Sequence, residues 1–515
     1  MKERLMILGA GVMQGPAIRI ANEMGLESVV VDGSKDAPCA GEAAIFEQID
    51  LKNKEKITEL ALRLKAEHGG LSGVMTAGTD FSATAAWVAE HTGLPGNTYS
   101  AALNASDKGR MRQCFKKAGV PSPEFFVTGK KTPAPPPFPY PVVVKPIDNM
   151  GGRGCKRANN ETELRRALDE ALKFSRAGQA IVEEYMDGPE YSVDAIVYGG
   201  KITICGLADR HIFFPPYFIE MGHTMPSKLE SETASMLLET FKTGVRSLGL
   251  TLGAAKGDIK LTSKGPMIGE IAARLSGGYM SGWTYPYSSG AEPTKAAILA
   301  ALGRLNADDP QGLRRERDWV SAERAFISIP GLVNTIKIME SAENNKYVKN
   351  IFFRAHERER VIFPENNVSK CGNVISAAPD RKDAVTAAEE AARGILIRLA
   401  PHDTATDIFL SADEDASNWP PSAFSVSEDV RKALAALPSG KPDLRRAAIA
   451  PFPALLDRGA VDYAGRSVAE SLEAVRTLTG LPLPLDREGS FGREFWTALL
   501  RGGYQGAAYI LDCLT

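Results

Sequence analysis

The sequence has little cysteine, no surplus of either charge and no long apolar run. Its 515 residues include six cysteines without a C-x-x-C pair, so neither a disulfide framework nor a thiolate zinc site is predicted, and a reducing cytoplasm is the expected location. Lysine and arginine number 61 against 63 aspartate and glutamate residues, which leaves no basic excess to attract nucleic acid or anionic lipid. No apolar stretch approaches the roughly 18 residues that span a bilayer. We therefore expect neither a nucleic-acid partner nor a membrane association.

The composition is that of a globular protein, with 44% hydrophobic and 24% charged residues. At about 150 residues per domain, the length indicates roughly three domains. Residues 4 to 8 form an apolar run before a glycine-rich turn, residues 17 to 24 have a helical pattern, and residues 27 to 31 form a second apolar run. This βαβ pattern, which alternates onward to about residue 100, predicts a doubly wound α/β domain.

The middle of the chain is predicted to have an α+β fold. Helices are predicted over residues 162–174 and 231–249, and antiparallel strands over 191–197 and 201–207. Residues 253–260 and 266–271 are expected to form a hairpin, residues 320–380 to be rich in short strands, and residues 384–399 to form a helix. Beyond residue 401, helix candidates at 467–478 and 492–500 have apolar faces, so we expect this region to pack on the body of the protein.

The first glycine cluster is Gly9-x-Gly11-x-x-x-Gly15, which departs from the G-x-G-x-x-G spacing of dinucleotide-binding turns. Asp32, at the end of the second strand, could hold a ribose hydroxyl. A dinucleotide-dependent oxidoreductase is one alternative, and a tight turn that only needs glycine is the other.

Lysines and carboxylates give a stronger signal. Lys108 lies just inside a helix, and Lys145 ends a buried strand before the loop Gly151-Gly152-Arg153-Gly154, whose backbone amides could close over phosphates. Asp258 and Glu270 fall on opposite strands of the predicted hairpin, where a cation such as Mg²⁺ would relieve their repulsion. Solvated lysines and carboxylates paired with ordinary surface cations remain the alternative.

The order of these motifs resembles the ATP-grasp superfamily of carboxylate–amine ligases, and is similar to L-amino-acid ligases, biotin carboxylase and the carbamoyl-phosphate synthase large subunit. The resemblance covers roughly residues 1 to 400. It rests on these segments: Ser106-Asp107-Lys108, Val144-Lys145-Pro146, Gly151-Gly152-Arg153-Gly154, Glu183-Glu184-Tyr185-Met186-x-Gly188-x-Glu190, Gly257-Asp258 and Gly269-Glu270-Ile271-Ala272-Ala273-Arg274.

The resemblance implies a domain order. A pre-ATP-grasp domain is expected over residues 1–104, and a two-lobed ATP-grasp domain over 105–320, with its small lobe at 105–190 and its large lobe at 191–320. A strand-rich part at 321–400 would complete the body, and 401–515 would be an accessory domain whose role the sequence does not define.

The resemblance also implies roles for individual residues. Lys108 and Lys145 would contact ATP phosphates, and the loop with Gly151, Gly152 and Gly154 would close over them. The Glu183 carboxylate would accept from the adenine amino group, the backbone of Glu184 and Met186 would read the adenine edge, and Glu190 would hold the ribose. Asp258 and Glu270 would ligate Mg²⁺, or Mn²⁺ in its place, and Arg274 would stabilise the transition state. Glu220, His223 and Arg210 are the candidate substrate residues.

The implied reaction is ADP-forming ligation of a carboxylate to an amine through an acyl phosphate, with an amino acid or small metabolite as substrate and a homodimer as the default assembly. A bicarbonate-using carboxylase or carbamoyl-phosphate-synthase-like enzyme is a second possibility. A non-catalytic ATP-binding regulator is a third, because Ala272 stands where the family usually has an asparagine metal ligand.

Overall fold

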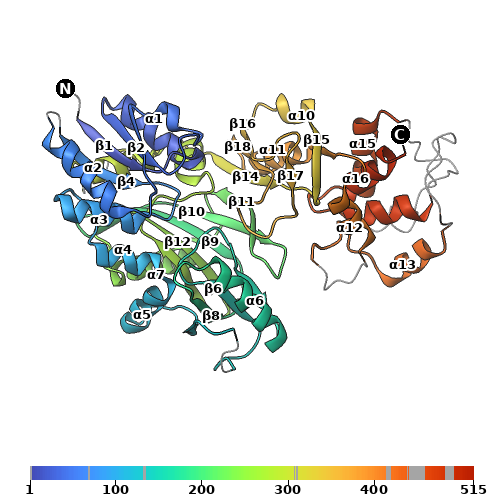
Figure 1. Cartoon of the computed structure of the whole chain (residues 1–515), viewed down its shortest axis with the longest axis horizontal. Coiled ribbons are helices and arrows are strands. Elements are labelled where there is room, and N and C mark those ends of the chain that lie inside the picture. Colours follow the sequence, from blue (N-terminus) through green and yellow to red (C-terminus); the bar gives the residue numbers. More distant parts are fainter. Residues whose placement is uncertain are drawn as a thin grey trace. The chain divides into compact units, whose positions relative to one another are not determined.

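A computed structural model describes residues 3–67, 70–131, 135–306, 308, 311–412, 419–437, 439, 459–481 and 492–514 (Figure 1). The chain divides into two compact units. Unit 1 holds Met1–Glu323 and Ala377–Ala384, and unit 2 holds Arg324–Ser376 and Val385–Thr515. No helix among the described residues combines the length and the apolar character that crossing a membrane requires.

Unit 1 begins with a parallel four-stranded sheet of order β3-β2-β1-β4. Its strands are β1 (Arg4–Leu8), β2 (Glu27–Asp32), β3 (Ile45–Gln48) and β4 (Leu71–Thr76). The connecting helices are η1 (Val12–Gln14), α1 (Gly15–Glu23), η2 (Ala40–Glu42), α2 (Lys54–Ala66) and α3 (Ser82–Thr92). The central strands are apolar because helices cover both faces, which confirms the predicted doubly wound domain.

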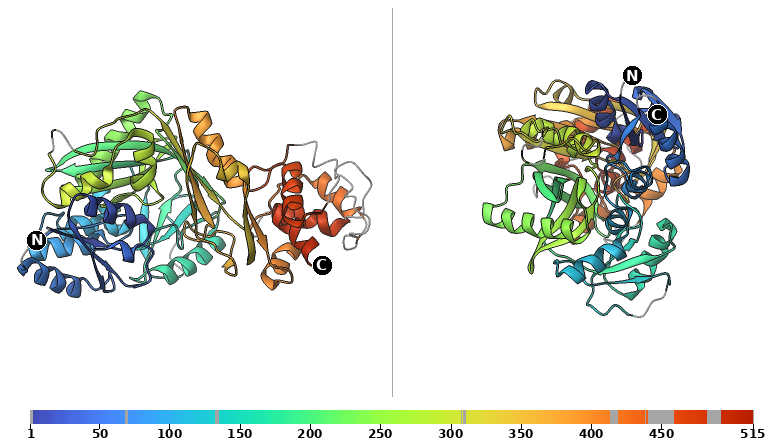
Figure 2. Two further views of the ribbon diagram at one scale, coloured as in Figure 1. Left: turned by 90° about the horizontal axis from the view of Figure 1, so that it is seen from above. Right: turned by 90° about the vertical axis from the view of Figure 1, so that its left-hand side faces the viewer.

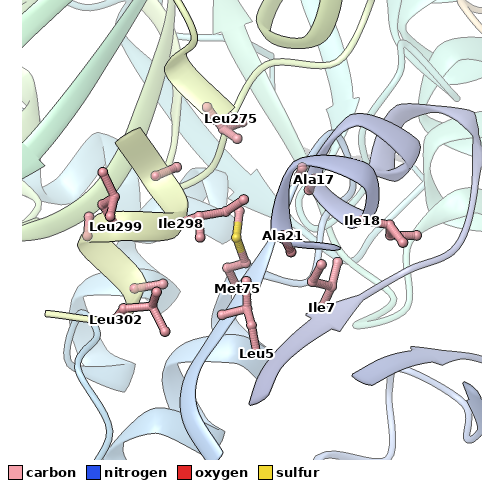
Figure 3. Packing of buried hydrophobic residues seen from close by; sticks show 14 of the residues in the cluster. Leu5, Ile7, Ala17, Ile18, Ala21, Met75, Leu275, Ile298, Leu299 and Leu302 are labelled. Carbon is pink, nitrogen blue, oxygen red and sulfur yellow. The ribbon is translucent and has the colours of Figure 1, made fainter. Parts of the chain in front are cut away.

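A helix from far along the chain completes one face of this sheet. Figure 3 shows α9 (Pro293–Ala301) and α1 on either side of β1 and β4, with Ile298 close to Met75. The same cluster includes Leu275, which follows the strand that carries Glu270. Burial of this apolar surface therefore fixes the first domain against the segment that carries the metal-site candidates.

A second, smaller sheet has the order β5-β8-β6-β7. Its strands are β5 (Phe125–Thr128), β6 (Val142–Pro146), β7 (Lys156–Ala158) and β8 (Ala180–Glu184), and the helices before it are α4 (Tyr99–Ser106) and α5 (Lys108–Ala118). Helix α6 (Glu161–Phe174) begins where the Asn160 side chain accepts from the Glu163 amide. Its apolar stripe, which includes Leu164 and Leu168, covers this sheet (Figure 1).

The larger antiparallel sheet of unit 1 runs in the order β13-β12-β9-β10-β11. Its strands are β9 (Glu190–Tyr198), β10 (Lys201–Phe213), β11 (Ile219–Met225), β12 (Leu252–Thr262) and β13 (Gly265–Ala272), which confirms the two predicted antiparallel strands and the hairpin. One face packs against α7 (Ser231–Ser247) through Phe241 and carries Val193, Ile259 and Ile271. Alternation along each strand turns the charged residues to the other face. The π-helical turn η3 (Met280–Thr284) and α8 (Tyr285–Ser289) follow β13.

Unit 2 contains the sheet β17-β15-β19. The chain enters it along β14 (Val320–Phe326). The elements that follow in chain order are β15 (Gly331–Ile338), α10 (Glu340–Glu343), β16 (Val348–Phe353), β17 (Arg360–Val361), β18 (Gly372–Ala378), α11 (Arg381–Arg393) and β19 (Ile395–Leu399). The end of β18 and the start of α11 belong to unit 1. The predicted helix over 384–399 is therefore wrong in its last third. Gly394 separates α11 from β19, whose apolar residues pair with β15.

The described part of residues 401–515 belongs to unit 2 and is helical. It consists of α12 (Thr404–Ser411), α13 (Glu428–Ala435), α15 (Val468–Thr479) and α16 (Arg493–Asp512), which gather in Figure 2. Val468, Leu472 and Val475 are buried against α16, and Arg398 on β19 forms an ion pair with Asp512 at 2.6 Å. These contacts confirm that the described helices pack on the strand-rich part before them.

Replacing Gly257 with alanine should destabilise the large sheet. A Cβ at this position would lie 2.6 Å from the Phe241 ring, which is itself buried under α7. We expect a loss of about 1–3 kcal/mol in the free energy of unfolding, measured by urea denaturation followed by circular dichroism. Gly41→Ala, where nothing lies within 4 Å of the added Cβ, is the matched control. Equal stability of the two variants would contradict this packing.

Candidate active site

The charged face of the large sheet carries the candidate site. Cross-strand pairing sets six positions in two rows over β9, β12 and β13: Asp194, Lys256 and Ala272 in one row, and Ser192, Asp258 and Glu270 in the next. Directly paired residues share a face, and so do alternate residues of one strand. The predicted opposition of Asp258 and Glu270 across the hairpin is confirmed.

The two opposed carboxylates are held by cations. Glu270 Oε1 lies 3.1 Å from Lys108 Nζ, which also donates to the Asn149 carbonyl oxygen at 2.7 Å. Burial opposes the charge on Glu270, but Lys108, Lys256 and Lys145 outweigh it and lower the pKa of its carboxyl to about 2. Glu270 is therefore ionised at neutral pH. The Glu270 side chain is 37% exposed.

Glu183 lies at the centre of a second, fully buried ion cluster. Its two oxygens accept from Arg112 Nε at 2.8 Å and contact Lys145 Nζ at 2.7 Å, and Arg112 also donates to the Gly269 carbonyl at 2.6 Å. Burial opposes ionisation, yet Arg112 and Lys145 hold the pKa of the Glu183 carboxyl below its usual value. This cluster links α5, β6 and β8 to β13.

The geometry differs here from the implied role of Glu183. The resemblance assigns its carboxylate to the adenine amino group, whereas the structure places both oxygens on cations, because two buried positive groups need a counter-charge. Glu183 thus positions the Lys145 ammonium. Beyond it along the chain, Glu184 contacts Lys264 at 2.5 Å, and the Met186 carbonyl accepts from Lys260 at 3.2 Å.

The glycine loop next to Lys145 has the backbone that its sequence predicts. Gly151, Gly152 and Gly154 all have positive φ, near 70°, 76° and 67°, which side chains disfavour. The neighbouring Cys155 is partly buried, and its desolvation raises the pKa of its thiol to about 11. The thiol is protonated at neutral pH, which agrees with its interpretation as an incidental small residue.

Arg210 joins three of the predicted site residues. Its guanidinium forms ion pairs with Glu190, with Glu220 at 2.6 Å and with Asp258 at 2.7 Å. Burial alone would lower the pKa of Arg210, but the three carboxylates raise it well above its usual value. The candidate ribose, metal and substrate residues are therefore held by one cation.

His223 pairs with Arg210 across β10 and β11, but its side chain makes different contacts. It is 0% exposed, with Nε2 at 2.9 Å from the Thr284 hydroxyl and Nδ1 at 3.3 Å from Glu323. The sequence reading that favoured a substrate contact for His223 does not match this position. The residue contributes to the packing of β11 against η3.

Arg274 interacts electrostatically with Asp80, a carboxylate that the sequence analysis did not single out. Its Nη1 donates to the Leu275 carbonyl at 3.0 Å, and its buried Nε has no hydrogen-bond partner among the described residues. Burial raises the pKa of the Asp80 carboxyl, while Arg274 and Lys108 act against that rise. Asp80 follows the carboxyl end of β4, the edge at which α/β sheets place ligand-binding residues, and this was the available signal.

Side chains of the first domain form hydrogen bonds within and around the opening glycine turn. Asp32 accepts from the amides of Ala10 and Ser34, both at 2.9 Å, and Gln14 reaches the Ala77 carbonyl. Both Asp32 oxygens therefore stabilise the turn, which agrees with the alternative of a tight turn that only needs glycine.

The residues present fit a divalent cation bound together with phosphate. Among the described residues, no group of three or more His, Cys, Asp or Glu side chains could hold a metal ion by itself. The opposed Asp258 and Glu270 offer two carboxylates, which suits Mg²⁺ because this ion keeps water and phosphate oxygens as its other ligands.

Two segments of the chain match known families, and its fold is similar to that of ATP-grasp proteins. Residues 138–282 match the ATP-grasp domain, and residues 325–400 match the L-amino acid ligase C-terminal domain 2. The crystal structure of L-amino acid ligase from Bacillus licheniformis has a TM-score of 0.68 with 19% identity, covering 77% of this chain and 99% of that chain. That likeness shows a shared fold.

Two curated relatives are similar over shorter stretches. Carnosine synthase 1 of Gallus gallus is 25% identical over 328 residues, which are 59% of this chain and 35% of the relative. Alanine–anticapsin ligase of Bacillus subtilis is 30% identical over 256 residues, which are 44% of this chain and 53% of the relative. The chain thus spans about half or less of the length of the curated relatives it matches.

Glu183→Gln should destabilise the protein strongly. The change leaves Arg112 and Lys145 without their shared counter-charge, and breaking a buried pair in this way costs about 3–5 kcal/mol. Urea unfolding at pH 7 measures the loss. Glu184→Gln, next along the chain and paired with exposed Lys264, is the control and should cost less than about 1 kcal/mol.

The difference in unfolding free energy between wild type and Glu183→Gln should depend on pH. The folded protein lowers the pKa of Glu183 from the ordinary value of 4.5, so its stabilisation is complete above that value and is lost as the pH falls through the folded pKa. The gap between wild type and Glu183→Gln should therefore be constant near neutral pH and shrink below about pH 4.5. A gap that stays constant into acid would contradict an ionised Glu183.

Proposed function

We propose that the protein is an ATP-dependent, ADP-forming ligase that joins a carboxylate to an amine through an acyl phosphate. The observation that carries this proposal is the convergence of Lys108, Lys145 and the opposed pair Asp258 and Glu270 beside a positive-φ glycine loop. Largely buried ammonium groups next to a glycine turn with positive φ suit phosphate, and the opposed carboxylates suit the Mg²⁺, or Mn²⁺, that accompanies it.

The reaction has two steps that balance. A substrate carboxylate oxygen attacks the γ-phosphorus of ATP, the bond from that phosphorus to the bridging oxygen breaks, and ADP leaves. An amine nitrogen then attacks the acyl carbon, inorganic phosphate leaves, and the nitrogen loses a proton. No side-chain nucleophile takes part, so positioning and charge neutralisation are the protein's contribution.

Each residue has a place in this scheme. Lys108 and Lys145 neutralise phosphate oxygens, and the loop with Gly151, Gly152 and Gly154 donates backbone amides. Glu190 faces the ribose, and the backbone of Glu184 and Met186 faces the adenine. Asp258 and Glu270 hold the cation, which withdraws charge from the phosphates. Arg274, whose Nε has no protein hydrogen-bond partner among the described residues, stabilises the charge that develops on the transferring phosphoryl group.

We propose an amino acid as one substrate. Alanine–anticapsin ligase is named for an amino acid that it joins, and the match to the L-amino acid ligase C-terminal domain 2 supports the same class. Asp80, half-buried after the end of β4, interacts electrostatically with Arg274, and this pair of opposite charges suits a zwitterion. We further propose that the protein acts in the cytoplasm on small molecules and assembles as a homodimer.

An ADP-release assay tests the proposal. The purified chain is supplied with MgATP and pools of amino acids and small carboxylates, with and without bicarbonate. We expect ADP with an amino-acid pool and without bicarbonate. Arg274→Met should lower kcat roughly 100- to 1,000-fold, because one preorganised charge is removed from the transition state, and Glu270→Ala should abolish ADP release.

The control for this assay is Glu239→Ala, an exposed residue on α7 that pairs with Lys242. It should leave ADP release unchanged. A strict requirement for bicarbonate would identify the carboxylase-like alternative. ATP binding without ADP from any pool would contradict the ligase and favour the regulatory interpretation that Ala272 raises.

A further inference from the structure

Lys256 lies directly across from Ala272 in the pairing of β12 with β13. Ala272 is the position at which the family resemblance leads one to expect an asparagine that binds metal. A methyl group at this position supplies no oxygen ligand. It also leaves the neighbouring space on this face to the long side chain of Lys256, its cross-strand partner. The side chain of Lys256 is only 15% exposed.

Lys256 lies near three acidic residues. Its ammonium forms an ion pair with Asp258, the residue pairs across the sheet with Asp194, and its charge is one of those that lower the pKa of the Glu270 carboxyl. Asp194 is itself buried, with its oxygens near the Ser276 amide at 3.3 Å and the Tyr285 hydroxyl at 3.0 Å. The ammonium is therefore held by Asp258, one of the two carboxylates proposed to bind the metal.

The remaining ligand positions favour one divalent cation over two. Asp258 Oδ1 contacts Arg210 and Ser192, and its Oδ2 contacts Lys256, whereas the Glu270 side chain is 37% exposed and pairs with Lys108 through Oε1. An ion anchored on Glu270 can therefore approach from the exposed side. A second divalent ion on the Ala272 side would meet a like-charged ammonium and lack the missing side-chain oxygen.

We propose that the Lys256 ammonium, opposite Ala272, takes the place of a second divalent cation, so that this site binds ATP with a single metal ion. The inference rests on the proposed function, because it concerns the cation that accompanies ATP. Lys256 then supplies, as a fixed charge of the protein, the positive charge that a second metal ion would otherwise bring from solution.

Counting bound Mn²⁺ tests this inference without any turnover. The full chain is saturated with the non-hydrolysable ATP analogue AMP-PNP, and free Mn²⁺ is followed by electron paramagnetic resonance as the ion is titrated in. We expect one Mn²⁺ per bound nucleotide for the wild type and two for Lys256→Met/Ala272→Asn. Lys256→Arg keeps the charge and should bind one. Lys242→Met on α7 removes a lysine outside the site and is the charge-matched control, with one ion expected.

The outcomes separate this inference from the proposed function. Two Mn²⁺ per nucleotide in the wild type overturn the role of Lys256, and this count stands even if a variant fails to fold. A folded double variant that binds one ion also overturns it. If the wild type binds no AMP-PNP, the ATP-dependent function itself is wrong, whereas nucleotide binding with two ions leaves that function intact.

Discussion

The opposition of Asp258 and Glu270 across β12 and β13 is the constraint on which the site depends. Two like charges on directly paired positions repel, and a sheet buried on its other face by α7 cannot turn either one away. Cations from three elements offset this repulsion: Lys108 from α5, Lys256 from β12 and Arg210 from β10. The buried cluster of Arg112, Glu183 and Lys145 repeats this pattern between α5 and the smaller sheet.

Local pattern was enough to predict the elements that carry this chemistry. Alternation of charged and apolar residues, as in Lys256, Asp258 and Lys260 against Gly257 and Ile259, identifies strands with one buried face. The predicted strands 253–260 and 266–271 are observed as Leu252–Thr262 and Gly265–Ala272. Opposition of two residues across a short turn follows from the hairpin alone, so the Asp258 and Glu270 pair was predictable. The functional roles of the site residues stay predictions.

Interactions between distant segments were not predictable from single residue patterns. The partners of Glu183 lie 71 and 38 residues before it in the chain, and its apparent exposure as a strand-end carboxylate gave no sign of them. Arg210 contacts several carboxylates because β9, β10 and β12 pair with one another. His223 is buried where β11 meets η3, which carries its partner Thr284. Residues 395–399 form a strand because β15 offers a partner, although their composition also suited a helix end. The place of Asp80 was not predictable either, because its loop is held by a β-bridge between Ala77 and Leu275, which lie far apart in the sequence.

An oxygen-isotope transfer experiment tests the central claim most directly. The substrate carboxylate that supports ADP release is labelled with ¹⁸O in both oxygens, and the inorganic phosphate formed during ligation is analysed by mass spectrometry. Attack of the carboxylate on the γ-phosphorus, followed by displacement at carbon, predicts one ¹⁸O in each phosphate released. Phosphate that carries no label, or oxygen only from the solvent, would contradict an acyl phosphate and the ligase chemistry that the paired lysines and carboxylates are proposed to perform.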